Sequence, residues 1–262
     1  MTLYNKIGNN YAQTRTSDPR IATTLLEILQ PASINTVVDI GAGTGSYARV
    51  LAESGYQVLA IEPSAIMRNQ ANPHPQIQWF GGSAENLPLA DRSVDATIIM
   101  LAFHHFQDYR QALREVDRVT MGGKIVLFTY DPDRISKFWL TRYFPSFVKD
   151  VQSTFLKISE LTSAIKTLTN TNVQVVPFLL PHDLMDSFAA VGWARPELYL
   201  DANVRNGIST FAKLERTELD DGLSQLRKDL EIGVWDREYG YLRQQQYCDL
   251  GYRFVHTIGS HL

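Results

Sequence analysis

Short apolar runs recur along the first half of the chain and predict strands that are buried on both faces. The runs cover residues 36–40, 57–62, 77–80, 94–100 and 123–129. Segments with apolar residues at helical spacing separate most of them, near 44–54, 64–71 and 107–119. Because each crossover must pack back over the sheet, this alternation predicts a doubly wound, mainly parallel α/β core with helices on both faces.

A helix is predicted before the first strand. Asp18 is placed to cap it, Pro19 suits its first turn, and Pro31 ends it. Ile21 and Leu25 belong to an apolar face with helical spacing, so this helix is expected to pack on the core.

The alternation breaks after residue 130. An aromatic stretch there, DPDRISKFWLTRYFPSFVKDV, predicts helix, and a helix near 158–169 and a strand near 173–179 follow it. Residues 181–250 predict mostly helix, and GYRFVHTIG at 251–259 predicts a last strand that returns to the sheet.

We therefore expect a single domain over residues 1–262, with helical insertions that cover a substrate. The expected core comprises about 16–130, 158–180 and 251–262, and the expected cap segments are about 131–157 and 181–250.

Composition narrows the class of protein. Of 262 residues, 44% are hydrophobic and 20% charged, which is typical of a folded globular chain. A net charge of −3, without a long Lys/Arg run, does not indicate a nucleic-acid partner. Cys248 is the only cysteine, so an internal disulfide and a multi-cysteine metal site are excluded.

The segment MTLYNKIGNNYAQTR lacks the apolar block of a signal peptide, and the chain has no apolar run of membrane length. We therefore expect a cytoplasmic protein with no membrane partner. No heptad pattern identifies a partner chain, and the oligomeric state stays open.

Three closely spaced glycines follow the first strand. Gly41, Gly43 and Gly45 allow positive φ and let a ligand lie on the backbone, beside the free N–H groups of the next helix. Glu62 ends the second strand, where a carboxylate can take both hydroxyls of a ribose. The pattern predicts a nucleoside-containing cofactor, with a tight structural turn as the alternative. Ser46 stands where the dinucleotide fingerprint needs a third glycine, which disfavours nicotinamide binding.

The stretch VVDIGAGTGSYA resembles motif I of the class I S-adenosylmethionine-dependent methyltransferases, in their small-molecule, type 11-like branch. Further segments fit this family in order: AIEPS, GSAENLPLADRSVDATIIM, LAFHHFQD and RVTMGGKIVLF, together spanning residues 37–128. The opening YNKIGNNYAQTR is similar to the helix that folds over the cofactor in this branch. The resemblance implies a Rossmann-like, mainly parallel seven-stranded sheet and S-adenosyl-L-methionine as cofactor.

The resemblance also implies roles for individual residues. Asp39 would orient the glycine turn and contact the methionine moiety, and Glu62 would hold the ribose. The implied cofactor-binding positions are Tyr4, Tyr11, Arg15, Asp39, Gly41, Ala42, Gly43, Gly45, Glu62, Pro63, Ile66, Ser83, Ala84, Glu85 and Leu101.

Some of these positions have an equally ordinary structural use. Pro63 and Ile66 would flank the adenine, and Leu101 would pack under the sulfonium, yet apolar residues there also suit a core. Ala84 would offer its N–H to adenine beside Ser83 or Glu85, although the family often has aspartate at position 83. Tyr4, Tyr11 and Arg15 would cover the sulfonium and pair with the carboxylate, or would simply form a surface helix.

His104 and His105 follow the fourth predicted strand, and we expect one of them to act as a base. A base matters only for an acceptor that is protonated at neutral pH. The alternative is that they help to start the helix near 107–119. Two adjacent histidines cannot chelate one metal from the same helix face, so no metal is predicted.

The acceptor is expected to contact the aromatic insertions. The expected substrate residues are His105, Tyr143, His182 and Trp193, and PHDLMDSFAAVGWARPELYLD is the expected wall of the site. Packing is the alternative use of most of these aromatic residues.

The sequence therefore predicts methyl transfer to a small-molecule acceptor through oxygen, nitrogen or carbon. Loops typical of base-flipping DNA methyltransferases are missing from the sequence. Two alternatives stay open: a non-catalytic module that binds S-adenosylmethionine, and a nicotinamide-dependent oxidoreductase.

Overall fold

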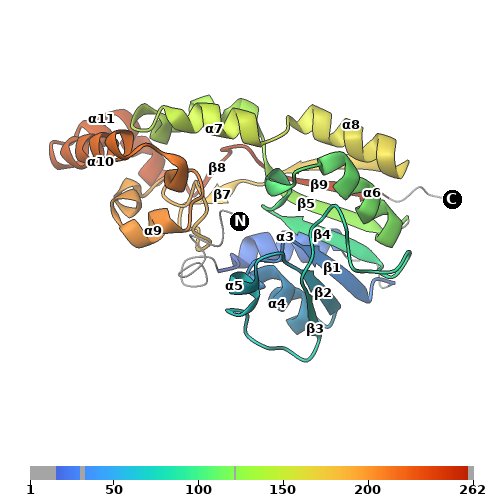
Figure 1. Ribbon diagram of the computed structural model, residues 1–262. Coiled ribbons are helices and arrows are strands. Elements are labelled where there is room, and N and C mark those ends of the chain that lie inside the picture. The colour runs from blue at the N-terminus through green and yellow to red at the C-terminus, as the bar shows by residue number, and fades with distance from the viewer. Residues whose placement is uncertain (1–15, 30–32, 121, 259–262) are drawn as a thin grey trace.

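A seven-stranded sheet forms the centre of the molecule in a computed structural model that describes residues 16–29, 33–120 and 122–258 (Figure 1). Its strands are β1 (Thr36–Ile40), β2 (Gln57–Ile61), β3 (Ile77–Phe80), β4 (Ala96–Met100), β5 (Lys124–Tyr130), β6 (Asn172–Pro177) and β9 (Tyr252–Ile258). They lie in the order β3-β2-β1-β4-β5-β9-β6, and β9 runs antiparallel to both of its neighbours while the pairs among β1 to β5 are parallel. The predicted Rossmann-like fold is confirmed, as is the return of the last strand to the sheet.

Helices cover both faces of this sheet. They are α3 (Pro19–Leu29), α4 (Ser46–Glu53), α5 (Ala65–Arg68), α6 (Tyr109–Thr120) and α8 (Ile158–Thr169). Successive residues of a strand point to opposite faces, so Val37 joins the apolar cluster of α3 and α4 whereas Val38 joins that of α6 and α8. Burial on both faces explains why the central strands β1, β4 and β5 are nearly continuous apolar runs.

Two insertions depart from the alternation. The first holds η3 (Pro132–Lys137), η4 (Trp139–Arg142) and α7 (Ser146–Thr154). The second holds β7 (Leu180–Pro181), η5 (Pro196–Leu200), α9 (Ala202–Asn206), η6 (Phe211–Lys213), α10 (Arg216–Glu231), α11 (Val234–Tyr239), η7 (Gly240–Gln244) and β8 (Tyr247–Cys248). Helices α9, α10 and α11 gather at one end of the molecule, and α7 runs toward them (Figure 1). Within the described part of the chain, no helix is long and apolar enough to span a membrane.

The insertions are less helical than their sequences predict. Proline interrupts the first one, where two short 3-10 helices precede α7. Residues 182–195 are all described and none of them is helical. Side chains bond to backbone there instead, since the Trp193 indole donates to the Pro181 carbonyl at 3.0 Å and that of Trp139 to the Trp193 carbonyl at 2.8 Å.

Asp18 joins the first helix to the second insertion. Its carboxylate caps α3 by accepting from the Arg20 amide at 3.0 Å, as predicted, and it also accepts from the Met185 amide at 3.0 Å. Burial alone would raise the pKa of Asp18, but hydrogen bonds from the Arg20 side chain and the Met185 amide outweigh it and lower the pKa. The segment around residue 185 is thereby fixed beside α3.

We predict that Asp18→Ala lowers the free energy of unfolding by about 3 kcal/mol, because the Met185 amide and the Arg20 charge lose their shared, buried partner. Urea unfolding measures the change. Thr23→Ala, on the exposed face of α3, is the control and should cost under about 1 kcal/mol. An equal loss in both variants would contradict the anchoring role.

Candidate active site

The turn after β1 has a backbone that only glycine suits. Gly41, Gly43 and Gly45 have φ of 75°, 60° and 85°, in the left-handed region. A Cβ added to Gly41 would also lie only 2.5 Å from the Cβ of Ala102. Conformation therefore favours glycine at these three positions, and at Gly41 the lack of space for a Cβ adds to it.

Glu62 follows β2 and ties its end to the glycine turn. Its carboxylate accepts from the Gly43 amide at 3.0 Å and from the Ser64 amide at 2.8 Å, and the residue is 7% exposed. Burial raises the pKa of Glu62, while these backbone hydrogen bonds and the Arg68 charge oppose the rise. Because each carboxylate oxygen can accept more than one hydrogen bond, the group retains acceptors for two ligand hydroxyls.

Asp39 is a second buried carboxylate in the same place. It lies in β1 and is 2% exposed, and its Oδ1 atom receives no hydrogen bond from the described residues. Burial, and next the charge of Glu62, raise the pKa of Asp39 to about 7. A donor or cation that meets Oδ1 would relieve this cost.

A cleft with about 390 Å³ of space, part of it open to solvent, adjoins the glycine turn and Asp39. Its walls come from β1, the glycine turn, α4, β4 and the second insertion, with the residues Asp39, Gly41, Ala42, Gly43, Thr44, Ser46, Tyr47, Met100 and Asp186. Asp186 is 1% exposed and accepts a hydrogen bond from the Tyr47 hydroxyl at 3.2 Å. The sequence prediction missed Asp186, since no local pattern marks it as a neighbour of the turn.

A larger cavity, with about 740 Å³ of space that is partly open, lies next to this cleft. Met100 lines the cleft and the next residue, Leu101, lines the cavity. Leu101 has a φ of 51°, uncommon for a residue with a side chain, and its amide donates to the Phe128 carbonyl at 2.8 Å. The end of β4 thus separates two adjoining spaces.

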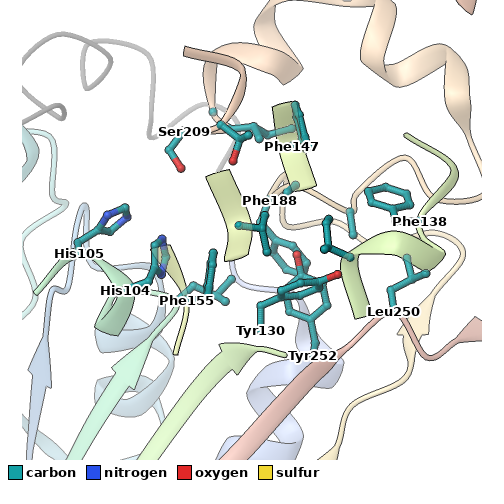
Figure 2. A pocket seen from close by; sticks show the side chains of 18 residues that line it. His104, His105, Tyr130, Phe138, Phe147, Phe155, Phe188, Ser209, Leu250 and Tyr252 are labelled. Atoms are coloured by element: carbon teal, nitrogen blue, oxygen red, sulfur yellow. The ribbon is translucent and has the colours of Figure 1, made fainter. Parts of the chain in front are cut away.

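Aromatic rings form one wall of the cavity, and Figure 2 shows Phe155 between the two histidines and the two tyrosines, with Phe188 beside the tyrosines. Ring centroids are 4.1 Å apart for His104 and Phe155, 5.7 Å for Phe155 and Tyr130, and 5.0 Å for Tyr130 and Tyr252. Phe188 continues the wall at 4.6 Å from Tyr252. A flat, apolar molecule suits such a wall.

The chain is similar to known methyltransferases. A family model described as a methyltransferase domain matches residues 38–128. A ubiquinone/menaquinone biosynthesis C-methyltransferase of Rubrivivax gelatinosus is 34% identical over 120 residues, which are 45% of this chain and 47% of that protein. A demethylmenaquinone methyltransferase of Corynebacterium urealyticum is 32% identical over 58% of this chain and 71% of its own length. A crystal structure from Anabaena variabilis, described as a methyltransferase from an antibiotic biosynthesis pathway, is 45% identical with a TM-score of 0.90, covering 94% of this chain and 99% of that one.

The chain belongs to the class I S-adenosylmethionine-dependent methyltransferases. The predicted family, enzyme class and cofactor are thereby confirmed. The matched stretch is about half the length of the Rubrivivax methyltransferase, so that protein's acceptor is not carried over with the family.

The structure brings together the cofactor residues that the sequence predicts around the turn. Asp39, Gly41, Ala42 and Gly43 line the cleft, and Glu62 bonds to the Gly43 amide. Gly45 precedes α4. The predicted Tyr4, Tyr11 and Arg15 lie outside the described residues.

The predicted adenine side lies on loops after β2 and β3. Pro63 and Ser83 are exposed, Ile66 is half-buried in α5, and Ala84 is buried. Glu85 is engaged elsewhere, because its carboxylate accepts from the Gln107 amide at 2.8 Å just before α6. A contact to adenine by Glu85 would therefore compete with this structural hydrogen bond.

His104 and His105 both line the larger cavity, at the end of the 3-10 helix η2 (Phe103–His105). Their ring centroids are 3.8 Å apart. In the part of the chain that the structure describes, no group of three or more His, Cys, Asp and Glu residues could hold a metal ion.

The structure places the other predicted substrate residues away from the cavity. Tyr143 is buried and its hydroxyl donates to Asp229 at 2.9 Å, and Trp193 is 1% exposed within the core. His182 is exposed, and its amide donates to the Gln246 carbonyl at 2.9 Å. None of the three lines either space, because these side chains are packed in the core or lie at the surface. Of the stretch expected to form the wall, Phe188 and the two alanines that follow it line the cavity.

We predict that this methyltransferase loses stability as the pH rises from about 4 to about 7, partly through Asp39. In that interval the unfolded chain ionises Asp39, whose ordinary pKa is ~3.9, while the folded chain keeps the proton. Asp39→Asn removes this contribution, so urea unfolding without cofactor should show a stability gain over wild type that is larger at pH 8 than at pH 5.

The control is Asp221→Asn, at an exposed position of α10, which should leave the pH dependence unchanged. An identical pH dependence in wild type and Asp39→Asn would show that Asp39 is already ionised at pH 5.

Proposed function

We propose that this methyltransferase modifies a small, uncharged acceptor with an aromatic or other flat ring, held in the larger cavity. The observation that supports this most is the aromatic wall beside Leu101. The cavity opens next to the glycine cleft, so an acceptor there would adjoin the cofactor's reactive end. The names of two relatives point to quinone biosynthesis, which agrees with a ring-bearing acceptor.

The cleft residues fit S-adenosylmethionine. Glu62 would accept hydrogen bonds from the ribose hydroxyls, and the bare turn at Gly41 and Gly43 would carry the amino-acid end. Asp39 and Asp186 are buried carboxylates of the same cleft, and a cationic ammonium would offset their burial. Pro63, Ile66, Ser83 and Ala84 would surround the adenine.

When bound, S-adenosylmethionine supplies a methyl group that is already activated. The residues of this chain therefore have to align the acceptor and exclude water. Leu101 would set the approach of the acceptor to the cleft, and Phe155 and Phe188 would hold its ring. We propose that residues 131–157 and 181–250 act as the cap that closes this space over the sheet.

A cytoplasmic location is also proposed. It is supported by the single cysteine, Cys248, which is half-buried at the edge of the second insertion. A chain without an internal disulfide is typical of a reducing compartment.

The test of the function is S-adenosylhomocysteine binding by calorimetry, followed by methyl transfer to a panel of ring compounds and to charged analogues of the same size. Turnover confined to uncharged ring acceptors is expected. Binding without transfer to any acceptor would favour a non-catalytic module, and turnover of charged acceptors alone would contradict the proposed acceptor class.

We predict that Glu62→Ala weakens S-adenosylhomocysteine binding at least ~10-fold, because hydrogen bonds to a charged group are lost. Glu53→Ala, at the exposed end of α4, is the control and should bind as wild type. Thermal unfolding verifies that both variants fold. If folded Glu62→Ala binds as tightly as wild type, Glu62 does not hold the ribose.

His105→Ala should lower kcat for a hydroxyl-bearing acceptor by ~100-fold near pH 7, since a general base is lost, while S-adenosylhomocysteine affinity stays the same. If the rise of the rate with pH on the acidic side of the profile disappears in the variant, His105 is identified as the base. His104→Phe keeps an aromatic ring stacked on Phe155 but has no ionisable nitrogen. It therefore tests whether His104 serves in the aromatic wall or as the base. An unchanged kcat in His105→Ala would mean that it is not the base for this acceptor.

A further inference from the structure

The polar side chains of the larger cavity are few and lie apart from one another. Among its described lining residues there is no Lys, Arg, Asp or Glu side chain. The side chains that carry nitrogen or oxygen are His104, His105, Tyr130, Ser209, Thr210 and Tyr252. The histidines lie at one end and the tyrosines lie beyond Phe155 (Figure 2). A molecule that fills this space therefore meets polar groups only at separated points.

Tyr130 is the unusual member of this set. It is 6% exposed, and its hydroxyl makes no hydrogen bond with the described residues. Other buried tyrosine hydroxyls of the chain are bonded, that of Tyr143 to Asp229 at 2.9 Å and that of Tyr199 to the Ala189 carbonyl at 2.8 Å. A buried hydroxyl without a protein partner is costly, so its retention calls for a use.

The hydroxyl of Tyr130 is a donor under ordinary conditions. Burial first, and then the nearby Asp131 charge, raise the pKa of Tyr130 well above its usual value. The group thus keeps its proton and can donate to an oxygen of a ligand.

Its position relates it to the cofactor cleft. Tyr130 ends β5, and Leu101 follows the neighbouring β4. Both lie at the carboxyl ends of parallel strands, where the Leu101 amide donates to the Phe128 carbonyl at 2.8 Å. The Phe155 ring stands between Tyr130 and His104, with centroid distances of 5.7 Å and 4.1 Å. Because the His104 ring stacks on one face of Phe155, a ligand ring beside Phe155 would lie on the side toward Tyr130.

We propose that the Tyr130 hydroxyl donates a hydrogen bond to a hydroxyl or carbonyl oxygen of the acceptor, and so selects uncharged ring compounds that carry an oxygen. This rests on the proposed function, since it assumes that the acceptor occupies the larger cavity. Tyr130 then discriminates between acceptors, because a ring without the oxygen leaves the hydroxyl unbonded.

The test uses two probes, 2-naphthol and naphthalene, which share a ring system and differ by one oxygen. Their dissociation constants are measured by ligand-observed NMR on protein saturated with S-adenosylhomocysteine. Tyr130→Phe removes only the hydroxyl, and we expect it to weaken 2-naphthol about 5–10-fold while naphthalene changes less than about 2-fold. Its thermal midpoint should not fall, since no protein hydrogen bond is lost.

Tyr143→Phe is the matched control, because it deletes a buried tyrosine hydroxyl that lies outside the cavity and bonds to Asp229. It should lower the thermal midpoint and leave both dissociation constants unchanged. Equal effects of Tyr130→Phe on the two probes, or no effect on either, would overturn the role of Tyr130 and leave the proposed function standing. Failure of wild type to bind either probe would overturn the apolar acceptor site itself and the role of Tyr130 with it.

Discussion

The Glu62 carboxylate joins the two strand ends on which the site depends. It accepts amide hydrogens from Gly43 and from Ser64, so one side chain holds the glycine turn of β1 against the end of β2. Three residues of the turn have left-handed conformations, and glycine populates positive and negative φ about equally. The hydrogen bond from Gly43 to Glu62 therefore helps to fix the turn in this conformation. Gly43, which donates to this carboxylate, lines the cleft, so the group that shapes the turn also adjoins the cleft wall.

A single irregular segment links the two spaces of the site. Asp186 lines the cleft and Phe188 lines the larger cavity, only two positions along the chain. The segment forms turns but no helix, and two side-chain contacts anchor it. Asp18 fixes the Met185 amide, and Tyr47 donates to Asp186. The cleft and the larger cavity therefore share one supporting segment.

The two insertions extend the apolar core rather than forming a separate one. Buried residues of α3 and β5 belong to the same cluster as Phe147 of α7 and Trp235 of α11. This continuity lets aromatic side chains from distant segments meet at the carboxyl ends of β4 and β5, where the larger cavity lies. Under the proposal, the polar atoms that remain there, above all the Tyr130 hydroxyl, would supply the selectivity that an apolar wall cannot.

Local patterns along the chain sufficed to predict the sheet, most crossover helices and the turn with Gly41, Gly43 and Glu62. Strands and helices follow from the spacing of apolar residues. The turn follows from glycines that allow positive φ and from an acid at a strand end. The insertions were a different matter. Their aromatic residues all suit a core or a wall, and the sequence favoured Tyr143 and Trp193, which the fold uses for packing, over Phe155 and Tyr130, which reach the cavity. Contacts between residues far apart in the chain decide which ring faces the cavity and place Asp186 beside Tyr47. Only tertiary packing determines such contacts.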